Sequence, residues 1–201
     1  MGSVTVHADD GSAVVSSQFE SASAGSMGLF PSAKRFAAGG GPVSVAIADL
    51  NDDGMADLVT ANNRSDDVSV LLGNGDGNFQ VAQAFAAGDR PQSLSIDDLD
   101  GDGLDDLVTV NPTLDGVSVL LGNGDGTFGA AQAFVAGDGP VSVAIADLDD
   151  DGVADLVTAN QSSNSVGVLL GNGNGTFQAA QAFVAGDGPV SIAIADLDDD
   201  G

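Results

Sequence analysis

The nine-residue segment DLNDDGMAD (residues 49–57) returns as DLDGDGLDD (98–106) and DLDDDGVAD (147–155), and it begins once more as DLDDDG (196–201). The copies start at residues 49, 98, 147 and 196, so the period is 49 residues. Other residues keep the same step, among them Pro42, Pro91, Pro140 and Pro189. A constant period of this length predicts one structural unit repeated along the chain.

The sequence within each unit favours β-structure. Residues 43–48 alternate large apolar with small side chains, as expected for a strand with one buried face. Residues 58–61 and 68–72 are short apolar runs, and a fourth strand is expected from about Phe79 to Phe85. Four short strands per unit predict an all-β fold of β-propeller-type blades, each a four-stranded antiparallel meander, in a partial propeller of about 3.5 blades. A β-solenoid is the alternative, but its repeats are usually shorter.

The loops of such a meander alternate between two edges of the sheet. The aspartate loop after the first strand and the Gly-rich turn after the third, GNGDGNF (73–79), should therefore share one edge. Segments between the second and third strands differ between copies and should lie at the opposite edge; they are NNRSDD (62–67), NPTLDG (111–116) and NQSSNS (160–165).

The repeat region is expected to cover residues 25–201. Its units are placed at about 37–85, 86–134, 135–183 and a shortened 184–201. Residues 1–24 match the repeat only faintly, and they are expected to be a leader or a degenerate blade edge.

The aspartate loops fit the pattern D-x-[DN]-x-D-G-x-x-D. Side-chain oxygens at positions 1, 3 and 5 converge if the loop curls tightly, which Gly at position 6 permits. Position 7 is apolar and offers only its backbone carbonyl as a ligand, while the Asp at position 9 completes the coordination shell of the metal ion. Hard oxygen ligands in this number select Ca²⁺, so we predict three complete calcium sites and one cut off by the end of the sequence. The predicted ligands are Asp49, Asn51, Asp53, Met55, Asp57, Asp98, Asp100, Asp102, Leu104, Asp106, Asp147, Asp149, Asp151, Val153, Asp155, Asp196, Asp198 and Asp200.

An EF-hand and a solvated acidic turn are the alternative interpretations of these segments. An EF-hand needs Glu at position 12 and flanking helices, whereas Thr stands there in each complete copy, inside a β-type run. A solvated acidic turn is the simple alternative, but three copies at constant spacing favour ligation. The Gly-rich turn is interpreted as a hairpin turn rather than a second metal site, because Asp76 and Asp125 become Asn174, which suits a turn residue with φ > 0. The Phe that follows is expected to plug the core between blades.

These aspartate loops, together with VLLGNGDG[TN]F-type segments such as residues 119–128, give the chain a resemblance to the integrin-like FG-GAP/VCBS repeat family. The resemblance covers roughly residues 25–201. It implies a β-propeller with calcium in the loop joining the first two strands of each blade, partners at the opposite rim, and an extracellular or cell-surface location. Complete propellers of this kind usually have about seven blades, so assembly with further blades or with another copy is expected.

The charge balance excludes several partners. Thirty acidic residues face four basic ones, and the net charge is -26. Such a surface repels nucleic acid and anionic membranes, and it strains the compact state unless cations neutralise it. No stretch reaches transmembrane length, and the N-terminal residues do not read as a signal peptide, so an export signal would lie outside this sequence.

The chain has few of the residues that usually serve as catalytic nucleophiles, acids or bases. The chain has no Cys and no Tyr, and its single histidine, His7, lies outside the repeats. We therefore predict a non-catalytic, calcium-stabilised module for extracellular adhesion, protein–protein interaction or scaffolding, with a protein or glycan ligand at the rim opposite the calcium loops. The alternatives are a lectin-like carbohydrate-binding propeller, or a non-catalytic accessory part of a larger secreted enzyme. Sugar sites usually use exposed Trp or Tyr, and the chain has neither.

Overall fold

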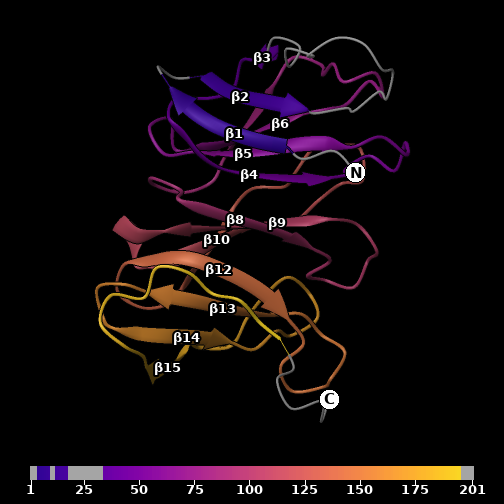
Figure 1. The fold of residues 1–201 in the computed structure, drawn as a ribbon. Helices are drawn as coiled ribbons and strands as arrows, with labels where there is room; N and C mark the ends of the chain where they lie inside the picture. Colours follow the sequence, from indigo (N-terminus) through magenta and orange to yellow (C-terminus); the bar gives the residue numbers. More distant parts are fainter. Residues whose placement is uncertain (1–3, 10–11, 18–33, 196–201) are drawn as a thin grey trace, which may run out of the picture.

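A computed structural model describes residues 4–9, 12–17 and 34–195 of the chain. These residues form antiparallel sheets stacked side by side (Figure 1). The first sheet comprises β4 (Pro42–Ala48), β5 (Asp57–Asn62), β6 (Asp67–Leu71) and β7 (Gln83–Ala86). The second comprises β8 (Ser93–Asp97), β9 (Asp106–Asn111), β10 (Gly116–Leu120) and β11 (Gln132–Val135). The third comprises β12 (Pro140–Ala146), β13 (Asp155–Asn160), β14 (Ser165–Leu169) and β15 (Gln181–Val184).

A three-stranded sheet precedes them. It is built from β1 (Val4–Asp9), β2 (Ser12–Ser17) and β3 (Lys34–Phe36), and β3 lies beside the first sheet. Over the described residues the one helical element is the short 3-10 turn Pro112–Leu114. No helix in this described part is long and apolar enough to span a membrane.

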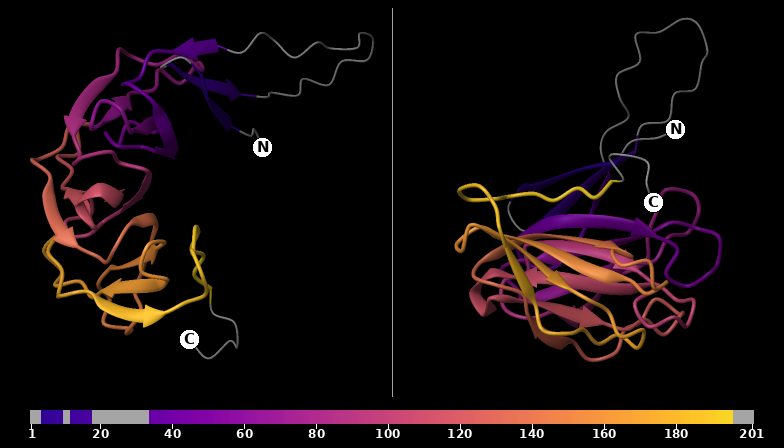
Figure 2. Two further views of the ribbon diagram at one scale, coloured as in Figure 1. Left: turned by 90° about the vertical axis from the view of Figure 1, so that its left-hand side faces the viewer. Right: turned by 90° about the horizontal axis from the view of Figure 1, so that it is seen from below.

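Strand order within each four-stranded sheet follows the chain, so each sheet is the antiparallel meander that the repeat predicted. The sheets follow one another around an open arc rather than a closed ring (Figure 2). The predicted fold class, propeller-type blades in a partial propeller, is thus confirmed. The unit boundaries drawn from the sequence stay a prediction.

The second strand of each sheet is buried along its whole length. All six residues of β5, β9 and β13 are buried, because each of these strands is covered on both faces. Alternate residues of one strand enter different cores: Val59 and Ala61 of β5 pack with Leu107 of the second sheet, whereas Leu58 packs with Phe36. This period of two explains why the repeat needs short, continuous apolar runs.

The first strands of neighbouring sheets lie close together. Strand β8 contacts both β4 and β12, and the hydroxyl of Ser95 in β8 donates to the carbonyl of Val143 in β12 at 3.1 Å. Small side chains at alternate positions, such as Ala46 and Ala48, let these strands approach.

The predicted start of the fourth strand was wrong. Strand β7 begins at Gln83, not near Phe79, and it is four residues long. Phe79 pairs instead with Gly73 in an isolated bridge that closes the Gly-rich turn. The aromatic spacing suggested one long strand because both Phe79 and Phe85 face a core, but the backbone of Phe79 is already paired within its own turn.

The phenylalanines plug the junctions between sheets, as expected. Edge-to-face pairs join Phe36 to Phe79, Phe85 to Phe128, and Phe134 to Phe177, with ring centroids 5.0, 5.5 and 5.4 Å apart. Each pair connects two consecutive sheets, and Phe128 and Phe177 are buried. Such pairs add about 0.5–1.5 kcal/mol beyond the area they bury.

Candidate metal centre

The aspartate loops connect the first and second strands of each four-stranded sheet. Each loop contains two residues with left-handed backbone, at positions 4 and 6 of the motif. In the first loop they are Asp52, with φ of 54°, and Gly54, with φ of 81°. A Cβ on Gly54 would meet nothing within 4 Å, so glycine is required there by its backbone angle and not by space.

The carboxylate at position 1 holds the loop closed. Asp49 accepts a hydrogen bond from the amide of Gly54 at 2.7 Å, and Asp147 accepts one from Gly152 at 2.8 Å. In the second loop Asp98 accepts from Gly103 at 2.9 Å. These bonds aim the carboxylate into the curl of the loop, where its remaining lone pairs can meet a cation.

The carboxylate at position 5 is held by the residue two positions later. The amides of Met55, Leu104 and Val153 each donate to this Asp at 2.8 Å. The structure therefore assigns the amides of these apolar residues a role in shaping the loop. Their carbonyls as calcium ligands stay a prediction.

The Asp at position 9 is buried and tied to two segments. Asp57 is fully buried, and its two carboxylate oxygens accept from the amides of Leu50, at 2.9 Å, and Gly73, at 2.7 Å. Asp106 and Asp155 repeat both bonds in the second and third sheets. This residue thus joins the aspartate loop to the Gly-rich turn and places both at one edge of the sheet, a connection that sequence reasoning did not identify.

Burial affects the charge of this inner carboxylate. It raises the pKa of Asp106 to about 6, although the amides of Gly122 and Leu99 partly oppose the shift. Burial also raises the pKa of Asp57, again against two amide bonds. A carboxylate that is costly to ionise in this position gains from a nearby cation.

The loops bring their carboxylates together in different subsets. In the second loop, oxygens of Asp98, Asp100 and Asp106 lie within 4.8 Å of one another. In the third loop the same is true of Asp147, Asp149 and Asp151. The first loop has Asn51 at position 3, whose side-chain amide donates to Asp53 at 3.1 Å. Asp196, Asp198 and Asp200 lie outside the described residues.

Neighbouring aspartate loops crowd one another. A small polar pocket of about 70 Å³ lies between the first and second loops, lined in part by Asp49, Asp52 and Asp105. Burial, followed by the charges of Asp97, Asp52 and Asp49, raises the pKa of Asp105. Both Asp97 and Asp105 stand where the other copies have Ala, so a comparison of the copies in the sequence could have identified them.

The Gly-rich turns are hairpin turns, but the predicted backbone role of their central residue was wrong. Asp125 accepts a hydrogen bond from the amide of Thr127 at 3.0 Å, and Asn174 accepts the equivalent bond from Thr176 at 3.1 Å. Positive φ belongs to the flanking glycines, such as Gly124 and Gly126. Asp and Asn are interchangeable here because each offers a side-chain oxygen to the amide two residues later.

The segments that differ between copies lie at the opposite edge, next to the links between sheets. The amides of Asn63 and Arg64 donate to the carbonyls of Gly41 and Gly40. A buried asparagine stands beneath this edge in each sheet, and in the third sheet the side-chain oxygen of Asn160 has no hydrogen-bond partner. Gly167 replaces there the serine that, in the second sheet, donates to Asn111.

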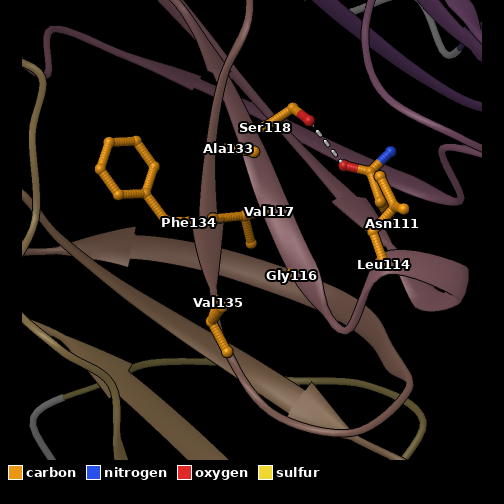
Figure 3. A pocket seen from close by; sticks show the side chains of 8 residues that line it. All are labelled: Asn111, Leu114, Gly116, Val117, Ser118, Ala133, Phe134 and Val135. Atoms are coloured by element: carbon orange, nitrogen blue, oxygen red, sulfur yellow. Dashed lines mark hydrogen bonds between the residues drawn. The ribbon is translucent and has the colours of Figure 1, made fainter.

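A shallow pocket opens at this edge of the second sheet (Figure 3). It measures about 80 Å³, with Leu114 and Asn111 on one side and Phe134 on the other. Leu114 and Val135 in its wall are 51% and 73% exposed. Pockets for small molecules are usually about 300–1,000 Å³, so this one has room for a single side chain.

The sequence matches the profile of one protein family in three overlapping places. The FG-GAP-like repeat matches residues 49–109, 98–158 and 147–201. No curated protein sequence matches the chain. Among solved structures, the chain is similar to part of a Tc holotoxin pore of Photorhabdus luminescens, with 20% identity and a TM-score of 0.44. That match covers 91% of this chain and 9% of the toxin chain.

Proposed function

The chain belongs to the FG-GAP-like repeat family, and from that premise we propose that it is a non-catalytic binding module stabilised by calcium in its aspartate loops. The observation that supports calcium most directly is the convergence of carboxylates. Three of them approach within 4.8 Å in the second loop and three in the third. Like charges so close repel one another unless a cation lies between them.

The donor set fits calcium better than other ions. Every predicted side-chain ligand is an oxygen of Asp or Asn, which excludes the nitrogen and sulfur donors that zinc and copper prefer. The segments between the first and second strands have no regular secondary structure, and their clustered carboxylates range from exposed in the third loop to partly or fully buried in the second. Such irregular loops suit the flexible coordination of Ca²⁺ more than the strict octahedron of Mg²⁺. Bound calcium would also offset part of the net charge of -26.

The expected contribution to stability is substantial. At about ten times the dissociation constant, each site adds about 1.4 kcal/mol to the free energy of unfolding, so three sites add about 4 kcal/mol. For a chain of this size that corresponds to a rise in melting temperature of about 10 °C. Extracellular calcium modules bind at about 10⁻⁴–10⁻³ M. Sites of that affinity fill outside the cell, which supports an extracellular or cell-surface location.

Thermal unfolding in calcium and in excess EGTA tests the proposal. The wild-type protein should melt about 10 °C lower in EGTA. Asp98→Asn should remove part of this difference, whereas Asp76→Asn, which deletes the same charge in a Gly-rich turn, should preserve it. Equal melting temperatures in calcium and EGTA would refute the calcium sites.

We propose that partners bind at the edge opposite the aspartate loops. Its segments differ between copies, and the pocket beside Leu114 has room for one side chain. An apolar pocket of this size supports a protein partner over a glycan. A glycan array and a pull-down from extracellular matrix, each with wild-type protein and Leu114→Asp, distinguish a protein partner from a glycan. A protein captured only by the wild type supports the protein partner. Calcium-dependent sugar binding contradicts it.

A further inference from the structure

The Gly-rich turns contain four Asn-Gly pairs, at residues 74–75, 123–124, 172–173 and 174–175. In such a pair the backbone nitrogen that follows the asparagine can attack the carbon of the side-chain amide, because glycine has no Cβ to obstruct the approach. All four asparagines are exposed. The pairs therefore share their chemistry and their access to water, while their hydrogen bonds differ.

A threonine anchors the first asparagine of the turn in the second and third sheets. Asn123 donates its side-chain amide to the hydroxyl of Thr127 at 2.9 Å. Asn172 donates in the same way to Thr176 at 3.0 Å. This bond fixes the amide group whose carbon would be attacked, and it must break before the group can turn toward the following nitrogen.

The first sheet lacks this threonine. Asn78 stands in its place, and the side-chain amide of Asn78 donates to Asp76 at 2.9 Å. Asn74 is therefore without the hydroxyl that anchors its two equivalents. Gly75 is also exposed, whereas the equivalent glycines of the other two turns are partly buried. Both the attacked group and the attacking nitrogen are thus freer in this turn.

The fourth pair is held at both of its reacting groups. The side-chain oxygen of Asn174 accepts from the amide of Thr176 at 3.1 Å and from its hydroxyl at 2.6 Å. Gly175 is buried, and its amide donates to the carbonyl of Leu99 in the preceding sheet at 3.1 Å. Its nitrogen can attack only after the contact between the two sheets has opened.

Asn74 lies between two contacts that tie its turn to the first aspartate loop. The residue before it, Gly73, donates its amide to Asp57 at 2.7 Å. The residue after it, Gly75, lies so close to Met55 that a Cβ there would be 2.6 Å from the sulfur. A change in the main chain at Asn74 therefore acts directly on the edge of the sheet that carries the aspartate loops.

We propose that Asn74 is a site of spontaneous deamidation, which places a new carboxylate and an isoaspartyl linkage beside the first aspartate loop. The nitrogen of Gly75 attacks Cγ of Asn74, so that a bond from nitrogen to Cγ forms and the bond from Cγ to Nδ2 breaks. Nδ2 leaves as ammonia with the proton of the Gly75 amide. Water then opens the cyclic imide at either carbonyl, giving aspartate or isoaspartate. In the isoaspartate the main chain runs through the side-chain carbons, which lengthens the turn.

Peptide mapping by mass spectrometry tests the proposal on the folded chain, incubated in mildly alkaline buffer with EGTA. Asn74 should deamidate about three- to tenfold faster than Asn123 and Asn172, the factor expected for one lost hydrogen bond. Asn174 should react most slowly. In denaturant all four asparagines should react at similar rates, because their flanking residues are nearly the same. The reaction needs no metal ion, so this test and the melting test of the calcium sites can fail separately.

Two reciprocal variants serve as matched controls. Asn78→Thr should slow the reaction of Asn74 to the rate of Asn123, and Thr127→Asn should raise the rate of Asn123 toward that of Asn74. Labelling by an isoaspartyl methyltransferase should mark the peptide that contains Asn74. The proposal is overturned if Asn74 stays intact while the denatured chain deamidates. Equal rates at Asn74 and Asn123 in the folded chain, or a rate at Asn174 as high as at Asn74, would overturn it as well.

Discussion

Residues 140–146 and 189–195 differ at one position in seven, yet they adopt different structures. The first segment, PVSVAIA, is strand β12 and pairs with β13 from Pro140 to Ala146. The second, PVSIAIA, is not in a strand and is mostly exposed. Because Ile favours strands as much as Val does, the substitution does not account for the difference. A partner strand does, since residues 155–160 lie beside the first segment and no described strand lies beside the second.

The strand propensity of this repeat is therefore realised only when a neighbouring strand completes a sheet. A single strand gains no ladder of hydrogen bonds and buries little apolar surface. The same holds for Phe134 and Phe183, since the first is covered by Phe177 of the next sheet while the second is half exposed.

Hydrogen exchange should show the largest contrast between the two segments. Amides of β12 that bond β13 should exchange at least about 1,000-fold more slowly than amides of residues 191–194, because their opening requires most of the global unfolding free energy. Mass spectrometry or NMR exchange measures both segments in one sample. Similar protection in the two segments would contradict the difference drawn here.

Introducing a charge into each segment should give the next largest effect. Val143→Asp places a carboxylate at a position that is 6% exposed, and it should lower the free energy of unfolding by about 3 kcal/mol or more. Ile192→Asp, at the equivalent partly exposed position, should change it by less than about 0.5 kcal/mol. Urea unfolding compares the two variants, and equal losses would show that residues 189–195 are packed.

Truncation of the equivalent phenylalanines should have a moderate effect. Phe134→Ala removes a ring stacked between two sheets and should cost about 2 kcal/mol, below the range for a fully buried Phe. Phe183→Ala should cost less than about 0.5 kcal/mol, because nothing in the described structure stacks on this ring. A loss for Phe183→Ala as large as that for Phe134→Ala would mean that the ring of Phe183 is already covered in solution.

The smallest effect is expected in the Gly-rich turns, whose structure depends on local hydrogen bonds. Hydrogen bonds from Thr127 hold the pKa of Asp125 below its usual value. The stabilising effect of this carboxylate is therefore present above its unfolded pKa of 3.8, and it is lost as the pH falls through the lowered folded value. The turn with Asn174 has no such group, so on acidification the NMR amide shift of Thr127 should titrate while that of Thr176 stays constant. Asp125→Asn should abolish the titration with little change in melting temperature.

Much of the fold could be predicted because the repeat constrains it. The period, the four strands per unit and the alternation of loop edges all follow from apolar patterning and from loop residues such as Gly54 and Gly103. The start of β7 could not be predicted, because the bridge between Gly73 and Phe79 depends on how the turn closes. Likewise, a count of turn residues could not show that the glycines beside Asp125, rather than Asp125 itself, take the positive φ.

For the metal centre, the sequence identified the loops but not their connections. The spacing of carboxylates predicted convergence, and the second and third loops each bring three carboxylates together. Sequence reasoning did not foresee that Asp57 bonds the amide of Gly73, sixteen residues away, or that Asp105 crowds the neighbouring loop. Both depend on contacts between segments that the chain brings together only by folding.

By itself, the sequence determined the unit: its length, its strands, its aspartate loops and the Phe that plugs each junction. These features are local, because they follow from side-chain alternation and backbone preference within a few residues. The tertiary structure decided how the units connect. Asp57 bonds the amide of Gly73, and each Phe pair joins two consecutive sheets, since these contacts join segments that only folding brings together.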